Sequence, residues 1–168
     1  MNTISKIPHG APQLSNRLFF RLYQCANMLH KTGTRALDSY SITTQQWAVL
    51  GGLTRPGFME GVAVGDLAEF LLVSRQNLTG LLRRLEAMDY VERAVDQHDN
   101  RSRLIRLTPK GRALWDENML PVISDYYDVA LRGFSTEDRI HMIHYLDKML
   151  NNFKAIDLEQ AGGEAAED

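Results

Sequence analysis

The sequence predicts a mainly α-helical chain that contains one small β-hairpin, and three observations carry this fold class. Apolar residues recur at spacings of three or four over several long stretches, which is the period of a helix that buries one face. Two short helical stretches, 65–71 and 74–88, follow each other almost without a break. After Asp89 the pattern changes to alternation over 90–95 and 103–107, which is typical of two paired strands.

The bulk composition allows one well-packed domain. The chain has 168 residues, 44% of them hydrophobic, and a formal net charge of -2. A small negative charge does not exclude nucleic-acid binding, because local clustering of cations matters more than their sum. The single cysteine excludes an intrachain disulfide, and neither a secretory signal nor an apolar run of roughly 18 to 20 residues is present. We therefore expect a cytoplasmic chain that does not enter a membrane.

The chain opens with a flexible arm over 1–13, where prolines and a glycine interrupt any apolar period. A long amphipathic helix is predicted over 14–40, and its length suggests an interface. Its apolar stripe consists of Leu14, Leu18, Leu22, Cys25 and Leu29. A second helix begins after Thr43, which forms a capping box with Gln46, and it stops before Pro56.

The next two helices form a helix-turn-helix, with the turn at Leu72 and Val73. Ser74 is a good N-cap for the second helix, because its hydroxyl can accept from a free amide of the first turn. Asp89 follows this helix at a position where a left-handed conformation is expected. The two strands and the turn DQHDNRS between them are expected to form a wing. The sequence therefore predicts a winged helix-turn-helix over 43–107.

Two long helices are predicted after the wing, over 109–153. Thr108 caps the first, Pro109 favours its start, and Pro121 is expected to kink it. The second begins near Ser135 with Asp138 at N3. Its apolar face consists of Ile140, Ile143, Leu146, Leu150 and Phe153. The tail at 154–168 is small and acidic, and we expect it to be disordered.

The helix over 74–88 carries a polar face of unusual composition. Its leucines lie on one stripe, whereas the opposite side carries few of the Glu and Lys residues of an ordinary solvated face. Arg can bond bidentately to guanine, Gln or Asn to adenine, and the Thr methyl can contact thymine, while Gly80 allows close approach. The candidate DNA-binding residues of this helix are Ser74, Arg75, Gln76, Asn77, Thr79, Gly80, Arg83 and Arg84.

The wing supplies a second signal, because the segment from Ser74 to Arg112 is locally basic although the chain is acidic. Arg101 and Arg103 at the wing would reach a minor groove and phosphates. Asp99 would orient Arg101 through a salt bridge. These three residues complete the predicted DNA-binding set.

From these motifs the chain resembles the MarR family of transcription regulators. The resemblance rests on the helix-turn-helix, on a wing with Asp-x-Arg at Asp99 and Arg101, and on a Leu-Thr-x-x-Gly entry from Leu107 to Gly111. Two departures are visible: Leu72 stands where the family often has Gly, and Asp89 and Tyr90 replace its usual Gly-Leu.

The resemblance implies a homodimer in which 14–40 and 109–153 supply the dimerisation helices. Two recognition helices would then bind successive major grooves of a pseudo-palindromic operator. It also implies a repressor that a small ligand releases, and we expect an aromatic acid or its coenzyme A thioester. Tyr23, Asn27, His30 and Trp47 are the candidate ligand-binding residues, since aromatic and hydrogen-bonding groups could converge there.

Alternatives come from other classes of protein. A redox regulator would use Cys25, but the cysteine of peroxide-sensing relatives aligns with Phe19, so a buried, unreactive Cys25 is expected. His141 and His144 lack further ligands, so neither a metal nor a cofactor is predicted. No motif of an enzyme is present. A winged-helix module that binds only protein remains the other alternative, although the clustered arginines disfavour it.

Overall fold

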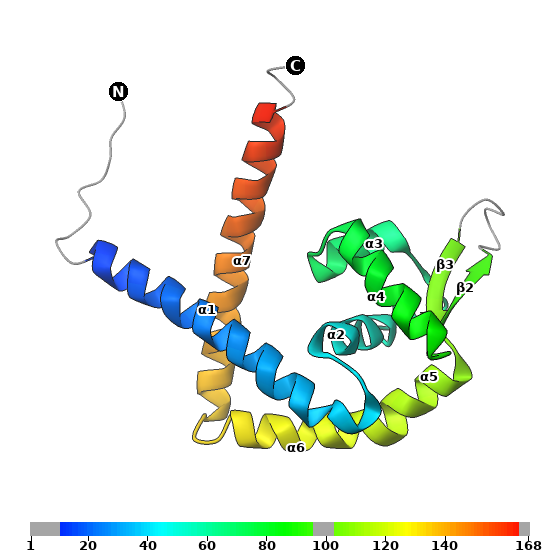
Figure 1. Ribbon diagram of the computed structural model, residues 1–168. Helices are drawn as coiled ribbons and strands as arrows, with labels where there is room; N and C mark the ends of the chain where they lie inside the picture. Colours follow the sequence, from blue (N-terminus) through cyan, green and yellow to red (C-terminus); the bar gives the residue numbers. More distant parts are fainter. Residues whose placement is uncertain (1–10, 96–102, 165–168) are drawn as a thin grey trace. The chain divides into compact units, whose positions relative to one another are not determined.

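The computed structural model describes residues 11–95 and 103–164, and the chain divides into two compact units, 1–126 and 127–168. The first unit contains α1 (Ala11–Ala36), η1 (Asp38–Tyr40), α2 (Thr44–Leu53), β1 (Val62–Ala63) and α3 (Val64–Leu71). It continues with α4 (Arg75–Ala87), β2 (Val91–Val95), β3 (Arg103–Leu107), α5 (Pro109–Ala113) and η2 (Leu114–Met119). Helix α6 (Leu120–Ala130) crosses the boundary, and α7 (Thr136–Glu164) belongs to the second unit. Figure 1 labels the helices α1 to α7 and the strands β2 and β3.

The core of the first unit lies between α2, α3, α4 and the small sheet. Leucines dominate it: Leu50, Leu67, Leu78, Leu82 and Leu85 are all fully buried. The sheet has the order β1-β3-β2, and both pairs are antiparallel. Its register places Val91 opposite Leu107 and Val62 opposite Ile105. The predicted winged helix-turn-helix is thus confirmed, with one strand more than the hairpin.

The predicted caps are present. Thr43 accepts from the Gln46 amide, and the Gln46 side chain accepts from the Thr43 amide, so the capping box at α2 is complete. Thr108 caps α5, where Pro109 occupies the first turn. At α7, Ser135 donates from its amide and hydroxyl to Asp138 and accepts from the Asp138 amide. The bonds from Ser135 to the ionised carboxylate lower the pKa of Asp138. The bond from the Ser135 backbone amide is the larger cause, and the bond from its hydroxyl is the next.

The first and last helices of the described chain extend further than predicted. Helix α1 begins at Ala11, inside the predicted arm. Helix α7 continues to Glu164, so the prediction of a disordered tail is wrong over 154–164. Ala155, Leu158 and Gln160 favour helix, and extending an existing helix avoids the cost of nucleation, so burial was not required.

The predicted kink at Pro121 has a different form. Directly before Pro121, the chain widens into the π-helical turn η2. Proline lacks an amide hydrogen and its ring crowds the carbonyl four residues back, and a wider turn relieves that conflict. Trp115 and Met119 of this turn are buried in the core.

Candidate nucleic-acid interface

Helix α4 starts where the sequence predicts, at the cap residue Ser74. The Ser74 hydroxyl accepts from the Asn77 amide at 3.2 Å. Leu72, in the turn before it, has φ 55°, and Asp89, just after it, has φ 61°. Both residues therefore hold the left-handed conformation that favours glycine, so the two departures from the family pattern preserve the backbone path. The predicted left-handed Asp89 is confirmed.

The two faces of α4 are sharply different. Leu78, Leu81, Leu82 and Leu85 are buried. The opposite face is exposed at Ser74, Arg75, Gln76, Asn77, Gly80, Arg83 and Arg84, and Thr79 is half-buried. Every predicted DNA-binding residue of this helix is thus at least partly exposed, and Arg75 lies on the flank that contacts α3.

Thr79 and Gly80 lie next to each other on this face of α4. The Thr79 hydroxyl donates to the Arg75 carbonyl at 2.7 Å, so its hydrogen is already used within the helix. A Cβ added at Gly80 would meet nothing within 4 Å. The fold therefore has no packing reason for glycine here, although glycine inside a helix costs about 1 kcal/mol relative to alanine.

Arg75 lies against the first turn of α3. A Cβ added at Gly65 would stand 3.0 Å from an Nη atom of Arg75. Arg75 therefore packs on the neighbouring helix, whereas Arg83 and Arg84 are exposed in the C-terminal half of α4.

The wing is only partly within the described residues. Arg103 is exposed at the start of β3, whereas Asp99 and Arg101 lie outside the described residues. Two other arginines of the basic segment form ion pairs: Arg93 with Glu86 at 2.7 Å and Arg106 with Glu92 at 2.8 Å. The locally basic segment contains both arginines and both glutamates, but their pairing across seven and fourteen residues was not predicted.

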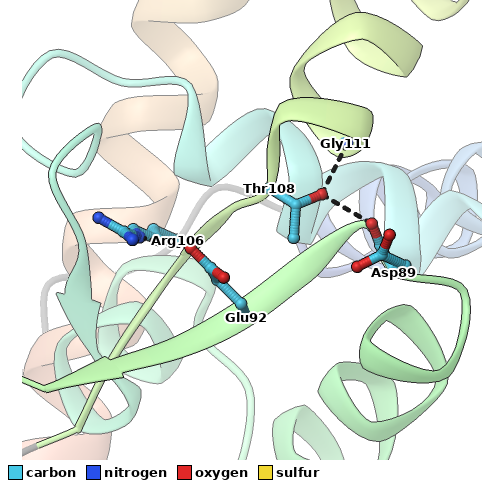
Figure 2. A network of polar contacts seen from close by, with 5 residues as sticks. All are labelled: Asp89, Glu92, Arg106, Thr108 and Gly111. Carbon is cyan, nitrogen blue, oxygen red and sulfur yellow. Dashed lines mark hydrogen bonds and ion pairs between the residues drawn. The ribbon is translucent and has the colours of Figure 1, made fainter.

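A network at the base of the wing joins the sheet to α5 (Figure 2). The Thr108 hydroxyl donates to the Asp89 carbonyl at 2.7 Å and accepts from the Gly111 amide at 3.0 Å. The Tyr90 carbonyl accepts from the Thr108 amide at 3.1 Å. A Cβ at Gly111 would overlap this same carbonyl, so the Leu-Thr-x-x-Gly motif has a steric cause. The network fixes the base of both strands.

The candidate ligand-binding residues are distributed over two helices. Tyr23, Asn27 and His30 are exposed on α1, and Trp47 is half-buried against the core from α2. The hydrogen bonds that join these two helices involve Thr34, Thr44 and the backbone carbonyl of His30 rather than the four candidate side chains. Their convergence on a ligand stays a prediction.

Cys25 corrects one expectation. Its thiol is exposed, not buried, because the described part of the chain leaves this stretch of α1 uncovered. Among the described residues no three His, Cys, Asp or Glu side chains gather in a way that could hold a metal ion. Over 11–95 and 103–164, no helix has both the length and the hydropathy that crossing a membrane requires.

Comparison with known proteins agrees with this geometry. The MarR family profile matches residues 40–102. The transcriptional activatory protein BadR of Rhodopseudomonas palustris is 54% identical over 156 residues, which cover 93% of this chain and 89% of that protein. The HTH-type transcriptional regulator TtmR of Methylorubrum extorquens is 34% identical over 114 residues, 67% of this chain and 57% of that protein.

Solved structures share the fold. The MepR–DNA complex of S. aureus has a TM-score of 0.70 and 25% identity, and the match covers 80% of this chain and 94% of that one. The structure of reduced AbfR bound to DNA also has a TM-score of 0.70, at 23% identity. The match covers 88% of this chain and 99% of that one.

A helix-turn-helix with an exposed polar second helix and a strand-built wing defines a transcription regulator of the winged helix-turn-helix class, which is not an enzyme. The extent of the similarity to the Rhodopseudomonas protein then settles the family. The chain belongs to the MarR family.

Proposed function

We propose that two copies of this chain bind a pseudo-palindromic operator, with each α4 in a major groove. The observation that carries this proposal is the outward face of α4, which combines hydrogen-bonding side chains with a glycine that the fold does not need. Gln76 and Asn77 suit adenine, Arg83 suits guanine, and the Thr79 methyl suits thymine. Ser74, Arg75 and Arg84 flank these groups and would hold phosphates.

The wing would extend the contact to the neighbouring minor groove. Arg103 is exposed at the start of β3, opposite Val95 and at the end of the hairpin away from Thr108. By the sequence motif, Arg101 would enter the groove and Asp99 would orient it. Contacts of this kind strengthen binding without reading much sequence.

Exposed apolar residues support a second copy as partner. On α1 they include Leu14 (69% exposed), Leu18, Phe20 and Leu29. On α7 they include Ile140, Ile143, Leu146 and Phe153. Stripes of this extent are unusual on a monomer, and a symmetric dimer would cover them. Half-sites would then lie roughly 34 to 36 Å apart.

A small aromatic acid or its coenzyme A thioester is the effector we propose, acting at Tyr23, Asn27, His30 and Trp47. It would lower operator affinity by binding better to an arrangement that does not fit DNA. The sequence predicted a repressor, whereas the similar Rhodopseudomonas protein is described as activatory, which favours activation. Since DNA binding itself sets neither sign, a promoter reporter with and without the chain decides between them.

The test is a mobility-shift titration with the DNA upstream of the chain's own gene, at 50 and 200 mM salt. If six or more phosphates are contacted, affinity should fall by roughly a thousandfold or more between the two conditions. A panel of aromatic carboxylates and their thioesters is then added to the complex. Absent or salt-insensitive binding would favour the protein-interaction module instead.

Exposed Cys25 makes a redox regulator the second candidate. If it is correct, peroxide should release the wild-type chain from DNA and leave Cys25→Ser bound. An equal response of both chains excludes it.

A further inference from the structure

Helix α1 is joined to α2 by a small hydrogen-bonded network of two threonines. The Thr44 hydroxyl donates to the His30 carbonyl at 3.0 Å. Since a threonine hydroxyl has one hydrogen, the 2.9 Å contact between the two hydroxyls must be donated by Thr34. Thr34 Oγ1 in turn accepts from the Thr44 amide at 3.2 Å. Each hydroxyl therefore both donates and accepts, and the bonds have one direction.

The surroundings make this network a rigid joint. Gly33 is buried beside it, and a Cβ there would stand 3.2 Å from the Thr44 hydroxyl oxygen. Leu37 and Ile42, on either side of η1, are both buried in the core. The capping box at Thr43 then fixes the first turn of α2. The link between the two helices is thus short and held at both ends.

The same part of α1 is also tied to α6. The Thr32 hydroxyl donates to the Met28 carbonyl at 2.7 Å. Its 2.8 Å contact with the Tyr126 hydroxyl is therefore donated by the tyrosine. One stretch of α1, from Met28 to Thr34, thus bonds to α6, a predicted dimerisation helix, and to α2, which packs in the winged core.

We propose that Thr34 and Thr44 are positioning residues that hold the winged helix-turn-helix on α1 and so set the half-site spacing that the dimer accepts. The proposal rests on the proposed function. Inserting one base pair moves a half-site by roughly 3.4 Å and turns it by about 35°. A dimer with a rigid joint rejects such an operator, whereas a dimer with a loosened joint follows the displaced half-site.

The test measures spacing preference rather than affinity alone. The wild-type chain first selects a duplex from a randomised library, and derivatives with one base pair added or removed between the half-sites are then made. Anisotropy titrations compare wild type, Thr34→Val, Thr44→Val and the double variant. Valine keeps the branched shape of threonine but removes the hydroxyl. Serine keeps the hydroxyl, so Thr34→Ser and Thr44→Ser should show the wild-type spacing preference. The single variants keep the test valid if the double variant does not fold.

Thr54→Val is the matched control, since the Thr54 hydroxyl donates to the Gly51 carbonyl at the end of α2 and, among the described residues, joins no second element. For wild type, we define the spacing preference as the affinity for the native duplex divided by the affinity for a duplex of altered spacing. We expect the valine variants to lower this ratio by about two- to tenfold, which is the change in affinity that corresponds to one hydrogen bond. The control should not change it. If the Thr34 and Thr44 variants keep the wild-type spacing preference, this proposal is overturned and the proposed function is not. Failure of the wild-type chain to bind any duplex overturns the proposed function and this proposal with it.

Discussion

At the scale of single residues, Gly80 separates stability from function most clearly. Glycine in an exposed helix costs stability, and nothing in the described chain fills the space beside it. We infer that this cost is retained because a side chain would prevent α4 from lying close to base edges. Glycine at this position would thus favour the proposed contact with DNA while it lowers the stability of the helix.

We predict that Gly80→Ala raises the free energy of unfolding by about 0.5 to 1 kcal/mol but weakens operator binding by about tenfold or more. Urea denaturation and anisotropy titration measure the two effects. Gly162→Ala is the matched control, because Gly162 also stands in a helix, α7, with open space beside it. It should stabilise the chain without changing DNA affinity, and an equal effect of both substitutions on binding would refute the role of Gly80.

Gly111 shows the opposite case, in which the fold itself requires glycine. We predict that Gly111→Ala destabilises the chain by about 2 to 4 kcal/mol, since the methyl group would overlap the Tyr90 carbonyl and part β2 from α5. Gly57→Ala, where a Cβ meets nothing within 4 Å, is the control and should be close to neutral. Thermal denaturation monitored by circular dichroism compares them. A neutral Gly111→Ala would contradict the geometry of the network.

Local signals in the sequence were sufficient for the residues whose role depends on near neighbours. Ser74, Thr108 and the pair Thr43 and Gln46 cap helices through atoms three residues away, so their pattern predicted their bonds. The Thr34 and Thr44 joint was missed, because ten residues separate the partners and only the folded turn between them brings the hydroxyls together. The exposure of Cys25 was missed for a related reason, since an apolar stripe does not say what covers it.

At the scale of elements, the start of α7 depends on an ionised carboxylate. Ser135 bonds hold the pKa of Asp138 below its usual value, so the charged form stabilises the helix start above the unfolded pKa, about 3.9. This contribution is lost as the pH falls through the lower folded pKa. We therefore predict that the stability difference between wild type and Asp138→Asn is present at pH 7 and shrinks below pH of about 4.

Urea denaturation over a series of pH values measures this difference. Glu137→Gln is the control, because Glu137 lies in the same first turn, whereas the bonds from Ser135 go to the carboxylate of Asp138. A difference between wild type and Asp138→Asn that does not change with pH would contradict a charge-dependent cap.

Several elements could not be predicted because distant parts of the chain create them. Strand β1 is only Val62 and Ala63, and it becomes a strand by pairing with β3 about forty residues later. The turn η2 reflects a conflict at Pro121 that the sequence indicated but whose resolution as a wider turn it did not specify. By contrast, α4 and its leucine stripe were predicted within a residue at each end, because one period and one cap define them.

At the scale of the whole molecule, the exposed apolar stripe of α1 is expected to form part of a dimer interface. We predict that Leu18→Glu lowers the mass measured by sedimentation equilibrium towards that of one chain, since a charge would be buried against the partner. Gln24→Glu on the same helix is the control for added charge. If the Leu18→Glu variant still has the mass of a dimer, the prediction that α1 forms part of the interface is wrong.

The central claim is that the outward side of α4 reads base edges from a two-fold scaffold. The most direct measurement is selection of operators from a randomised library by wild type, Arg83→Ala and Arg101→Ala. We predict that Arg83→Ala relaxes preference at one base pair in each half-site, placed symmetrically and costing about 1 to 3 kcal/mol, while Arg101→Ala weakens all sequences alike. Identical preferences in wild type and Arg83→Ala, or a change on one side of the operator only, would contradict the account.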